Sequence, residues 1–232
     1  MTTVYLVRHG HTANNKSLSY NGCLSNQPLN ELGQKQAEAL TEAFAELPLD
    51  AIYSSPLRRA MMTAEGVRGT RDMAIEEVYD LREMDMGDLD GVTFAEVREK
   101  HPDIWYNWHD DPEKLLMPNG ESFFDVRARG AAAIAKLVRR NRGKSIAIVA
   151  HSTLFCLSMT RFLGLTLHDR YRLPYLTNAA YHTLLIEDDG SFRVAKFGEV
   201  GHLENGLLAH ANPWGNAAEF AGTFVYEDFA GV

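Results

Sequence analysis

The stretch that most constrains the fold of this chain is an apolar run near its start that ends abruptly in charged and polar residues. Residues 4–7 read Val-Tyr-Leu-Val, a composition typical of a strand buried on both faces of a sheet. Arg8, His9 and Gly10 follow directly. Open α/β sheets bind ligands at the carboxyl ends of their strands, so this junction can hold a nucleophilic imidazole beside an anion-binding guanidinium. The alternative is that the strand simply reaches solvent here.

A second apolar run ends in the same way. Residues 145–150 read Ser-Ile-Ala-Ile-Val-Ala, and His151 follows them at the start of a helical pattern that continues to Gly164. Two buried strands that both end at a histidine favour a functional site over a chance exit to solvent.

Along the chain, apolar spacing and turn residues predict the alternation of helices and strands of an α/β domain. Expected helices lie over residues 30–47, from Ser55 onward, and over 93–101, 122–140 and 151–164, while expected strands lie at 51–54, 74–79, 180–186 and 192–197. Residues 11–28 are expected to form a loop, and residues 104–117 lack helical periodicity. No fold is predicted beyond Glu199.

The helix after residue 54 opens with a candidate cap and a first-turn proline, Ser55 and Pro56. Arg58 would lie in the first turn, where a cation opposes the helix dipole at a cost of a few tenths to about 1 kcal/mol. An arginine in that position suits a second task, namely binding an anion at the same helix end. Arg59 would point elsewhere, and we expect it on the surface.

The loop 81–87 places a carboxylate, Glu83, among apolar residues. Glu83 in that setting can have a raised pKa, as a general acid needs. The alternative is a surface glutamate that lies beside Arg82.

Residues 104–117 carry an irregular aromatic cluster that includes Trp105 and Trp108. Such a cluster can form the underside of a packed loop or a platform that stacks on a ligand. We hypothesise that this segment and the tail after residue 199 border a ligand pocket and select part of the ligand.

Length and composition set the outer limits. With 232 residues, of which 45% are hydrophobic and 23% charged, the chain fits a single domain over residues 1–232, with a core at about 3–198 and a tail, 199–232, of uncertain fold. The formal charge of −8 argues against nucleic acid or an anionic membrane as a partner, so any bound phosphate needs a local basic pocket. The patterns do not reveal the oligomeric state and leave a homodimer open.

The two cysteines, Cys23 and Cys156, form neither a metal-binding spacing nor a disulfide framework. The chain shows no apolar signal segment and no run of membrane-spanning length. We therefore expect a cytoplasmic protein.

Five segments in order resemble the histidine phosphatase superfamily, also called the phosphoglycerate mutase-like family. They are Leu6 to Gly10 with Asn15, Ser54 to Ala60 with Thr63-Ala64, Leu81 to Glu83 followed by Gly87 and Asp90-Gly91, Asn119 to Ser122, and the strand that ends at His151. Together they cover the chain from residue 3 to about residue 186.

The resemblance implies a three-layer α/β/α sandwich with a mostly parallel central sheet, whose strand ends gather the catalytic residues in one pocket. It implies that His9 attacks phosphorus and becomes a phosphohistidine, while Glu83 protonates the leaving oxygen and then activates water. The phosphate would be bound by the other members of the set, which are Arg8, Asn15, Arg58 and His151. We expect neither a metal ion nor a cofactor.

Three positions depart from the family pattern. Many relatives carry glutamate where this chain has His11, which is either a pocket residue or a loop residue. Ser152 replaces a common glycine and adds a hydroxyl near the phosphate site, so we count both residues as candidate phosphate-binding or substrate-binding groups. The loop 21–25 matches only loosely.

The expected activity is hydrolysis of a small organic phosphate monoester, because the segment between Glu83 and His151 is shorter than in the mutases and leaves the site open to water. The alternatives are a phosphoglycerate mutase-type phosphoryl transfer and a catalytically weak module that binds phosphate or a partner. A metallohydrolase with His9 and His11 as ligands is a fourth reading, weakened by the lack of a carboxylate-rich partner motif.

Overall fold

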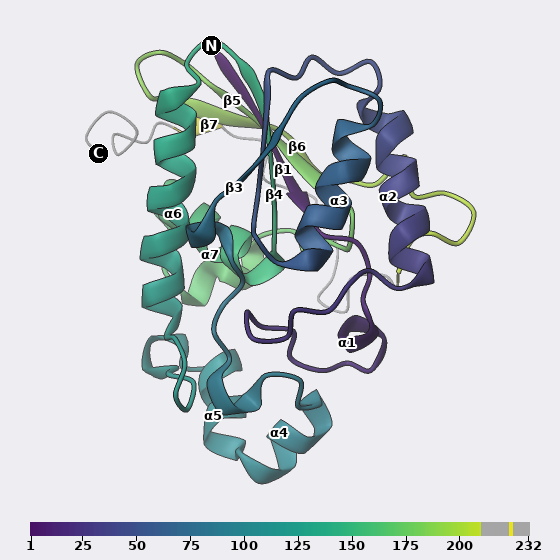
Figure 1. Cartoon of the computed structure of the whole chain (residues 1–232). Coiled ribbons are helices and arrows are strands. Elements are labelled where there is room, and N and C mark those ends of the chain that lie inside the picture. The colour runs from purple at the N-terminus through teal and green to yellow at the C-terminus, as the bar shows by residue number, and fades with distance from the viewer. Residues whose placement is uncertain (210–222, 225–232) are drawn as a thin grey trace.

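A seven-stranded β-sheet organises the computed structural model, which describes residues 1–209 and 223–224 (Figure 1). The strand order is β3-β2-β4-β1-β5-β6-β7, in which the first four strands run parallel and the last three pair antiparallel. The strands are β1 (Thr2–Arg8), β2 (Ala51–Ser54), β3 (Ile75–Glu77), β4 (Ser145–Ala150), β5 (Tyr181–Ile186), β6 (Phe192–Glu199) and β7 (Thr223–Phe224). The sheet is thus mixed, with its parallel part around β1 and β4.

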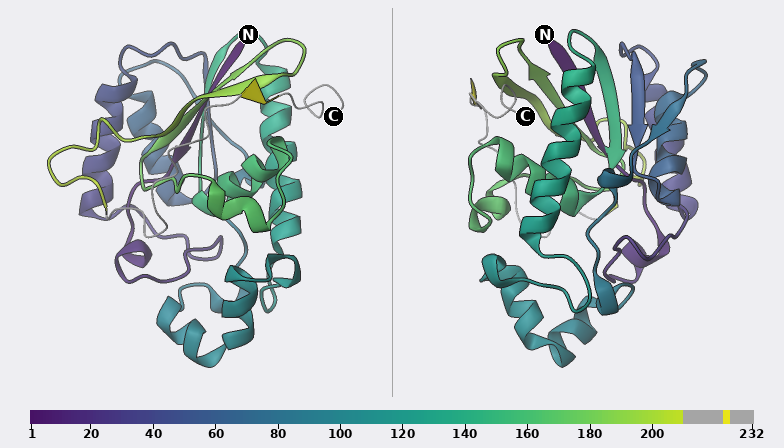
Figure 2. Two further views of the ribbon diagram at one scale, coloured as in Figure 1. Left: turned by 180° about the vertical axis from the view of Figure 1, so that it is seen from behind. Right: turned by 60° about the vertical axis from the view of Figure 1, so that its left-hand side comes forward.

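Helices cover both faces of the sheet (Figures 1 and 2). One face is covered by α2 (Glu31–Phe44) and α3 (Arg58–Arg68), and the other by α6 (Phe123–Arg140) and α7 (Ser152–Phe162). Alternate residues of β1 enter the two cores, because successive side chains of a strand point to opposite faces: Tyr5 and Val7 pack with α2 and α3, whereas Val4 and Leu6 pack on the other side. The predicted α/β/α sandwich is confirmed.

Side-chain caps begin three of the predicted helices. Asn30 accepts the backbone N–H of Gly33 at the start of α2, and the Ser122 hydroxyl accepts that of Asp125 at the start of α6. Thr93 and Glu96 form a reciprocal capping box at α4 (Phe94–Lys100). Such caps satisfy N–H groups that have no partner within the helix, which explains why these boundaries could be read from the sequence.

Two segments differ from the prediction. Residues 11–28 contain a short helix, α1 (Ala13–Lys16), which is capped by Thr12. Residues 104–117 were expected to lack a helix, but α5 (Pro102–His109) begins in this region at a proline in its first turn. The remaining short elements are single 3₁₀ turns: η1 (Tyr79–Leu81), η2 (Gly87–Leu89), η3 (Pro112–Lys114) and η4 (His168–Arg172).

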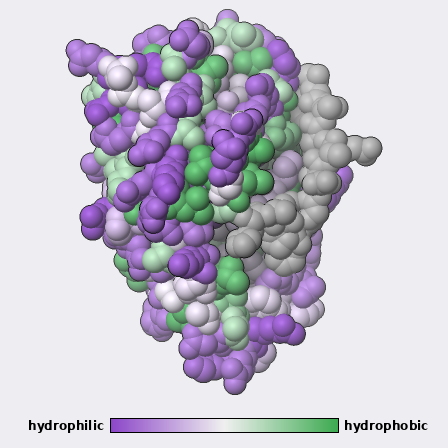
Figure 3. Space-filling model, turned by 90° about the vertical axis from the view of Figure 1, so that its right-hand side faces the viewer, coloured by the Kyte–Doolittle hydropathy of each residue, from purple (hydrophilic) through white to green (hydrophobic). Residues whose placement is uncertain are grey.

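The surface over α2 is largely hydrophilic around a smaller apolar area (Figure 3). Within the described residues, no helix combines the length and the apolar character that a bilayer-spanning segment requires. The predicted tail lies within the description only at residues 199–209 and 223–224, and the rest of it lies outside.

Candidate active site

The parallel pairing of β1 with β4 places two histidines side by side. Arg8 pairs with Ala150 at the ends of the two strands, so His9 and His151 leave the sheet at the same edge. Their ring centroids are 5.1 Å apart, and the exposed fractions are 2% for His9 and 0% for His151. The helices after these strands, α2 and α7, lie on opposite faces, the arrangement that opens a ligand crevice in α/β sheets (Figure 1).

One hydrogen bond sets the tautomer of His9. Its Nδ1 lies 2.7 Å from the carbonyl oxygen of Gly10, and a carbonyl can only accept, so Nδ1 carries the proton. Burial, followed by the charges of Arg59 and Arg8, holds the pKa of His9 well below the usual value. The neutral ring therefore presents an unprotonated Nε2, the atom that a nucleophile needs.

The backbone around His9 is held from both sides. The carbonyl oxygen of His9 accepts the side-chain amide of Asn178 at 3.1 Å and the backbone N–H of Ala179 at 3.2 Å. The N–H of Gly10 donates to the Thr63 hydroxyl at 2.9 Å. A side chain at Gly10 would also collide with the carbonyl of Gly33, since its Cβ would lie only 2.8 Å away. The backbone that carries His9 is therefore held rigidly.

Arg8 contributes a buried cation to the cavity wall. Its Nη1 donates to the Tyr175 hydroxyl and to the carbonyl of Leu176, both at 2.7 Å. Its Nε is buried and has no hydrogen-bond partner in the described part of the chain. A buried donor of this kind can meet an anion.

The two arginines at the start of α3 occupy the opposite places to those predicted. Arg58 is exposed, whereas Arg59 is 0% exposed. The helix begins at Arg58, not near Ser55, and successive helical residues point about 100° apart, so only Arg59 joins the buried face with Ala60 and Thr63. The sequence prediction for both arginines was therefore wrong.

Arg59 lies at the site where Arg58 was expected. Its guanidinium donates to backbone carbonyls of the loop above the site, namely those of Asn21, Gly22 and Ser25. Burial lowers its pKa to about 10, so it stays cationic at neutral pH, and its charge lowers the pKa of both His9 and His151. Like that of Arg8, its Nε is buried without a partner among residues 1–209 and 223–224.

Ser55 contacts the second histidine, and its hydroxyl also accepts the backbone N–H of Leu57, the residue before α3, at 3.4 Å. The Ser55 hydroxyl lies 2.8 Å from Nε2 of His151, and the helix cap is Leu57, which makes no side-chain cap bond. Burial, followed by the charge of Arg59, holds the pKa of His151 well below its usual value. Its Nδ1 is the third buried nitrogen near His9 without a partner in the described chain. The proton of neutral His151 lies on Nδ1 when Ser55 donates in this bond and on Nε2 when His151 donates.

Glu83 is buried, at 5% exposure, which removes the surface alternative. Its Oε1 accepts the N–H groups of Met84 at 2.9 Å and Leu154 at 3.1 Å, while Oε2 accepts only that of Thr153, at 3.1 Å. Burial raises the pKa of the carboxyl, and the three N–H donors offset only part of this effect. Oε2 retains room for a proton, in agreement with the expected general acid.

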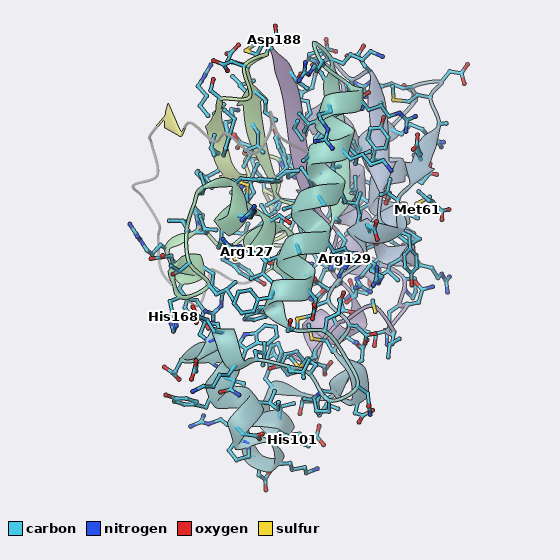
Figure 4. The ribbon with its side chains drawn as sticks, turned by 90° about the vertical axis from the view of Figure 1, so that its left-hand side faces the viewer. Met61, His101, Arg127, Arg129, His168 and Asp188 are labelled. Atoms are coloured by element: carbon cyan, nitrogen blue, oxygen red, sulfur yellow. The ribbon has the colours of Figure 1, made fainter. Side chains whose placement is uncertain are left out.

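An ion pair braces the loop that carries Glu83. Arg129 of α6 binds Glu121 through two hydrogen bonds, at 2.9 and 2.8 Å, and donates to the carbonyls of Asp80 and Arg82. Glu121 in turn accepts the N–H of Asp85 at 2.9 Å. Arg129 leaves α6 on the side opposite Arg127 (Figure 4). The loop is thus held on both sides of Glu83.

The three remaining predicted residues also line the cavity. Oδ1 of Asn15 accepts bonds from Thr12 and Asn178, which turns its amide nitrogen away from these partners. Nδ1 of His11 lies 2.8 Å from the amide nitrogen of Asn30, whose oxygen is fixed by capping Gly33, so Nε2 of neutral His11 carries the proton. His11 is thus a buried pocket residue. Ser152 stands at the first position of α7.

The cavity has a volume of about 530 Å³, and Arg8, His9 and Glu83 lie in its wall. Trp105, Trp108 and Ala209 line it as well, so the prediction that residues 104–117 and the tail border the pocket is confirmed for the described residues. In α5 the aromatic side chains at 105, 108 and 109 repeat at spacings of three and one, which gathers them on one side of the helix.

The described residues contain no group of three or more His, Cys, Asp or Glu side chains able to hold a metal ion. His9 and His11, the ligands of the metallohydrolase alternative, instead use their Nδ1 atoms for bonds to protein groups.

Sequence reasoning missed four residues of the site: Ser55, Arg59, Tyr175 and Asn178. For Arg59 a signal was present, because Ala60, Thr63, Ala64 and Val67 repeat at helical spacing and place residue 59 on the buried face. Tyr175 and Asn178 lie in the irregular connection before β5, where no periodicity marks them.

Comparison with known proteins agrees with this geometry. Residues 4–199 match the histidine phosphatase superfamily (branch 1), and the chain belongs to this family. It is 29% identical to phosphoserine phosphatase 1 of Hydrogenobacter thermophilus, over 81% of this chain and 88% of that protein. It is 30% identical to a metal-independent phosphoserine phosphatase of Arabidopsis thaliana, over 92% of this chain and 90% of the relative.

Solved structures agree as well. YhfR of Bacillus stearothermophilus superposes with a TM-score of 0.83 at 33% identity, over 88% of this chain and all of that one. A mycobacterial glucosyl-3-phosphoglycerate phosphatase superposes with a TM-score of 0.77 at 28% identity, over 84% of this chain and 98% of that one. These relatives support the predicted activity, hydrolysis of a phosphate monoester through a histidine intermediate.

Proposed function

We propose that this protein is a metal-independent phosphomonoesterase in which His9 is the nucleophile. Nε2 of His9 attacks phosphorus, and the bond from phosphorus to the ester oxygen breaks as the new P–N bond forms. Glu83, whose pKa is raised by burial, gives a proton to the departing alkoxide oxygen. The products of this step are the free alcohol and a phosphohistidine.

Arg8 and Arg59 neutralise the charge on the transferring phosphoryl group. Their buried Nε–H groups, together with Nδ1 of His151 when it carries the proton, supply donors that the described protein leaves unused. The amide of Asn15 adds a further donor from α1, and Nε2–H of His11 and the Ser152 hydroxyl stand where they can bind the substrate. Arg58 is exposed and has no part in this scheme.

The second step returns the enzyme to its starting state. Glu83, now a carboxylate, takes a proton from water as the water oxygen attacks phosphorus. The P–N bond breaks, inorganic phosphate leaves, and His9 is again neutral with a free Nε2. Glu83 is again protonated, so protons and charge balance over the cycle.

The observation that carries this proposal is the fixed tautomer of His9. A buried imidazole with Nδ1–H bound to a carbonyl and Nε2 unprotonated, beside two cations, is prepared for attack on a phosphate dianion. Location in the cytoplasm stays a prediction.

The test measures phosphate release from p-nitrophenyl phosphate in excess chelator, with wild type and His9→Ala. We expect full activity of the wild type in chelator and none from His9→Ala. Loss of the wild-type activity on chelation, or its survival in His9→Ala, would sink the proposal. Interconversion of 2- and 3-phosphoglycerate without net phosphate release would identify a mutase, and phosphate binding without turnover would identify a binding module.

A further inference from the structure

We propose that the alcohol part of the substrate is a bulky apolar or aromatic group that fills the cavity beyond His9. The inference rests on the proposed phosphatase activity and adds the substrate class. It follows from the contrast between the two ends of the cavity, because Arg8, His9 and Glu83 lie at the phosphate end, whereas aromatic and aliphatic side chains form much of the rest.

The cavity beyond His9 is walled by aromatic rings from separate elements. Tyr20, Trp108 and Phe123 form one edge-to-face cluster, with centroids 5.2 Å apart for Tyr20–Trp108 and 4.9 Å apart for Trp108–Phe123. Trp105, Phe155 and Tyr175 line the same space. A volume of about 530 Å³ far exceeds what a phosphate needs and falls in the range of sites for organic ligands.

The arginine and carboxylate side chains of this wall either belong to the phosphate end or already bind protein groups. Arg8 and Glu83 belong to the phosphate end, which leaves Arg170 as the remaining arginine or carboxylate among the described residues that line the cavity. Arg170 donates to the carbonyls of Leu167, Trp108 and His109 and to the Tyr171 hydroxyl. Its guanidinium also stacks on the rings of Tyr171 and Phe123, at 4.0 and 5.3 Å from their centroids.

Two further side chains of the cavity lining are neutral at neutral pH because they are buried. Burial lowers the pKa of His182 to about 4, and its Nδ1 accepts the N–H of Gly198. Burial also raises the pKa of the Cys156 thiol to about 12, so it stays protonated. At neutral pH these two side chains add no charge to the apolar part.

A charged alcohol would therefore lose its hydration without gaining an ion pair. The amino and carboxylate groups of phosphoserine are such groups, although relatives of about 30% identity are named phosphoserine phosphatases. An apolar alcohol gains from the same desolvation, roughly fourfold in affinity for each methylene that is buried. The structure thus favours a different substrate from the one in those names.

The decisive comparison uses esters of primary alcohols, which share the chemistry of the leaving oxygen. We expect kcat/KM to be about 100-fold higher for 3-phenylpropyl phosphate than for ethyl phosphate, and lowest for O-phosphoserine. If ethyl phosphate or O-phosphoserine is hydrolysed as well as 3-phenylpropyl phosphate, the inference is wrong and the phosphatase activity stands. If no ester is hydrolysed, the proposed function itself fails.

A substitution locates the effect. Cys156 lines the cavity on α7, so Cys156→Phe should fill part of it and lower kcat/KM for 3-phenylpropyl phosphate at least about tenfold more than that for ethyl phosphate. Arg161→Phe places the same ring on an exposed position of the same helix and is the matched control. Equal effects of Cys156→Phe on both esters would contradict the proposed location, and the wild-type ranking stands as a test if this variant does not fold.

Discussion

The two ends of the cavity are built in different ways. At the phosphate end, His9, Glu83 and His151 sit at strand ends or in a braced loop, and each is oriented by hydrogen bonds to backbone or hydroxyl groups. At the aromatic end, the rings of Tyr20, of Trp108 in α5 and of Phe123 in α6 meet edge to face. The first end depends on the register of the sheet and the second on segments outside it.

This difference separates chemistry from specificity. A change at the phosphate end should alter the reaction of every ester, because all of them share the phosphoryl group. A change at the aromatic end should alter the ranking of esters, because only the alcohol part reaches it. Five substitutions test this division.

Glu83→Gln should have the largest effect. It removes the proton needed by an alkoxide leaving group, so kcat for alkyl phosphates should fall about 10³-fold, while p-nitrophenyl phosphate, with its better leaving group, should lose much less. In wild type, kcat/KM should fall as pH rises through the raised pKa of Glu83 and should persist below pH 6.5, because His9 stays neutral there. Equal losses for both esters would argue against a general acid. If kcat/KM of Glu83→Gln still falls at high pH, that fall reports the titration of another group.

The next effect separates the two neighbouring arginines. Arg59→Ala should lower kcat/KM about 10²- to 10³-fold for every ester, because a cation at the phosphate is lost, whereas Arg58→Ala should stay within about twofold of wild type. Steady-state kinetics on three esters, with thermal unfolding to confirm folding, measures both. The reverse order of effects would restore the role first predicted for Arg58.

Arg129→Lys should lower activity less than loss of the general acid or of the buried arginine, because it should affect only the position of Glu83. Lysine keeps the charge but cannot bind Glu121 through two bonds and also hold the carbonyls of Asp80 and Arg82, so Glu83 becomes less well placed. We expect kcat for alkyl phosphates to fall about tenfold with little change in KM. An effect on KM alone, or none on p-nitrophenyl versus alkyl selectivity, would show that Arg129 does not act through Glu83.

Apart from the near-neutral Arg58→Ala, Trp105→Ala should give the smallest change, and its pattern should differ. The ring is partly exposed on α5 and lines the cavity, so its loss should reduce the preference for 3-phenylpropyl over ethyl phosphate by about three- to tenfold while kcat for ethyl phosphate stays near wild type. A uniform loss on both esters would place Trp105 with the phosphate end.

The same division explains what the sequence could predict. Strand ends at His9 and His151, and caps at Asn30, Thr93 and Ser122, follow from local patterns with a direct physical cause, and the structure confirms these placements. Glu83 was recognised because a carboxylate among apolar neighbours is unusual.

The errors arose where tertiary packing decides. The start of α3 is set by packing of its buried face. The prediction relied on Ser55 and Pro56 instead, so it placed the helix start too early and assigned the buried position to Arg58 and the surface position to Arg59. Helix α5 is too short for its periodicity to stand out, and its Pro102 was read as the end of the preceding helix, not as the start of a new one. Tyr175 and Asn178 reach the site because tertiary folding brings the connection before β5 to it, and no local sequence pattern marks that contact.

The most direct test of the central claim is to identify the residue that is phosphorylated during turnover. Enzyme mixed with p-nitrophenyl phosphate is quenched in alkali within milliseconds, and its peptides are analysed by mass spectrometry. Our account predicts one phosphoryl group on the peptide that contains His9, located on Nε2 by NMR and absent from His9→Ala. A phosphoryl group on His151 or another residue, or steady turnover with no phosphoenzyme under single-turnover conditions, would contradict it.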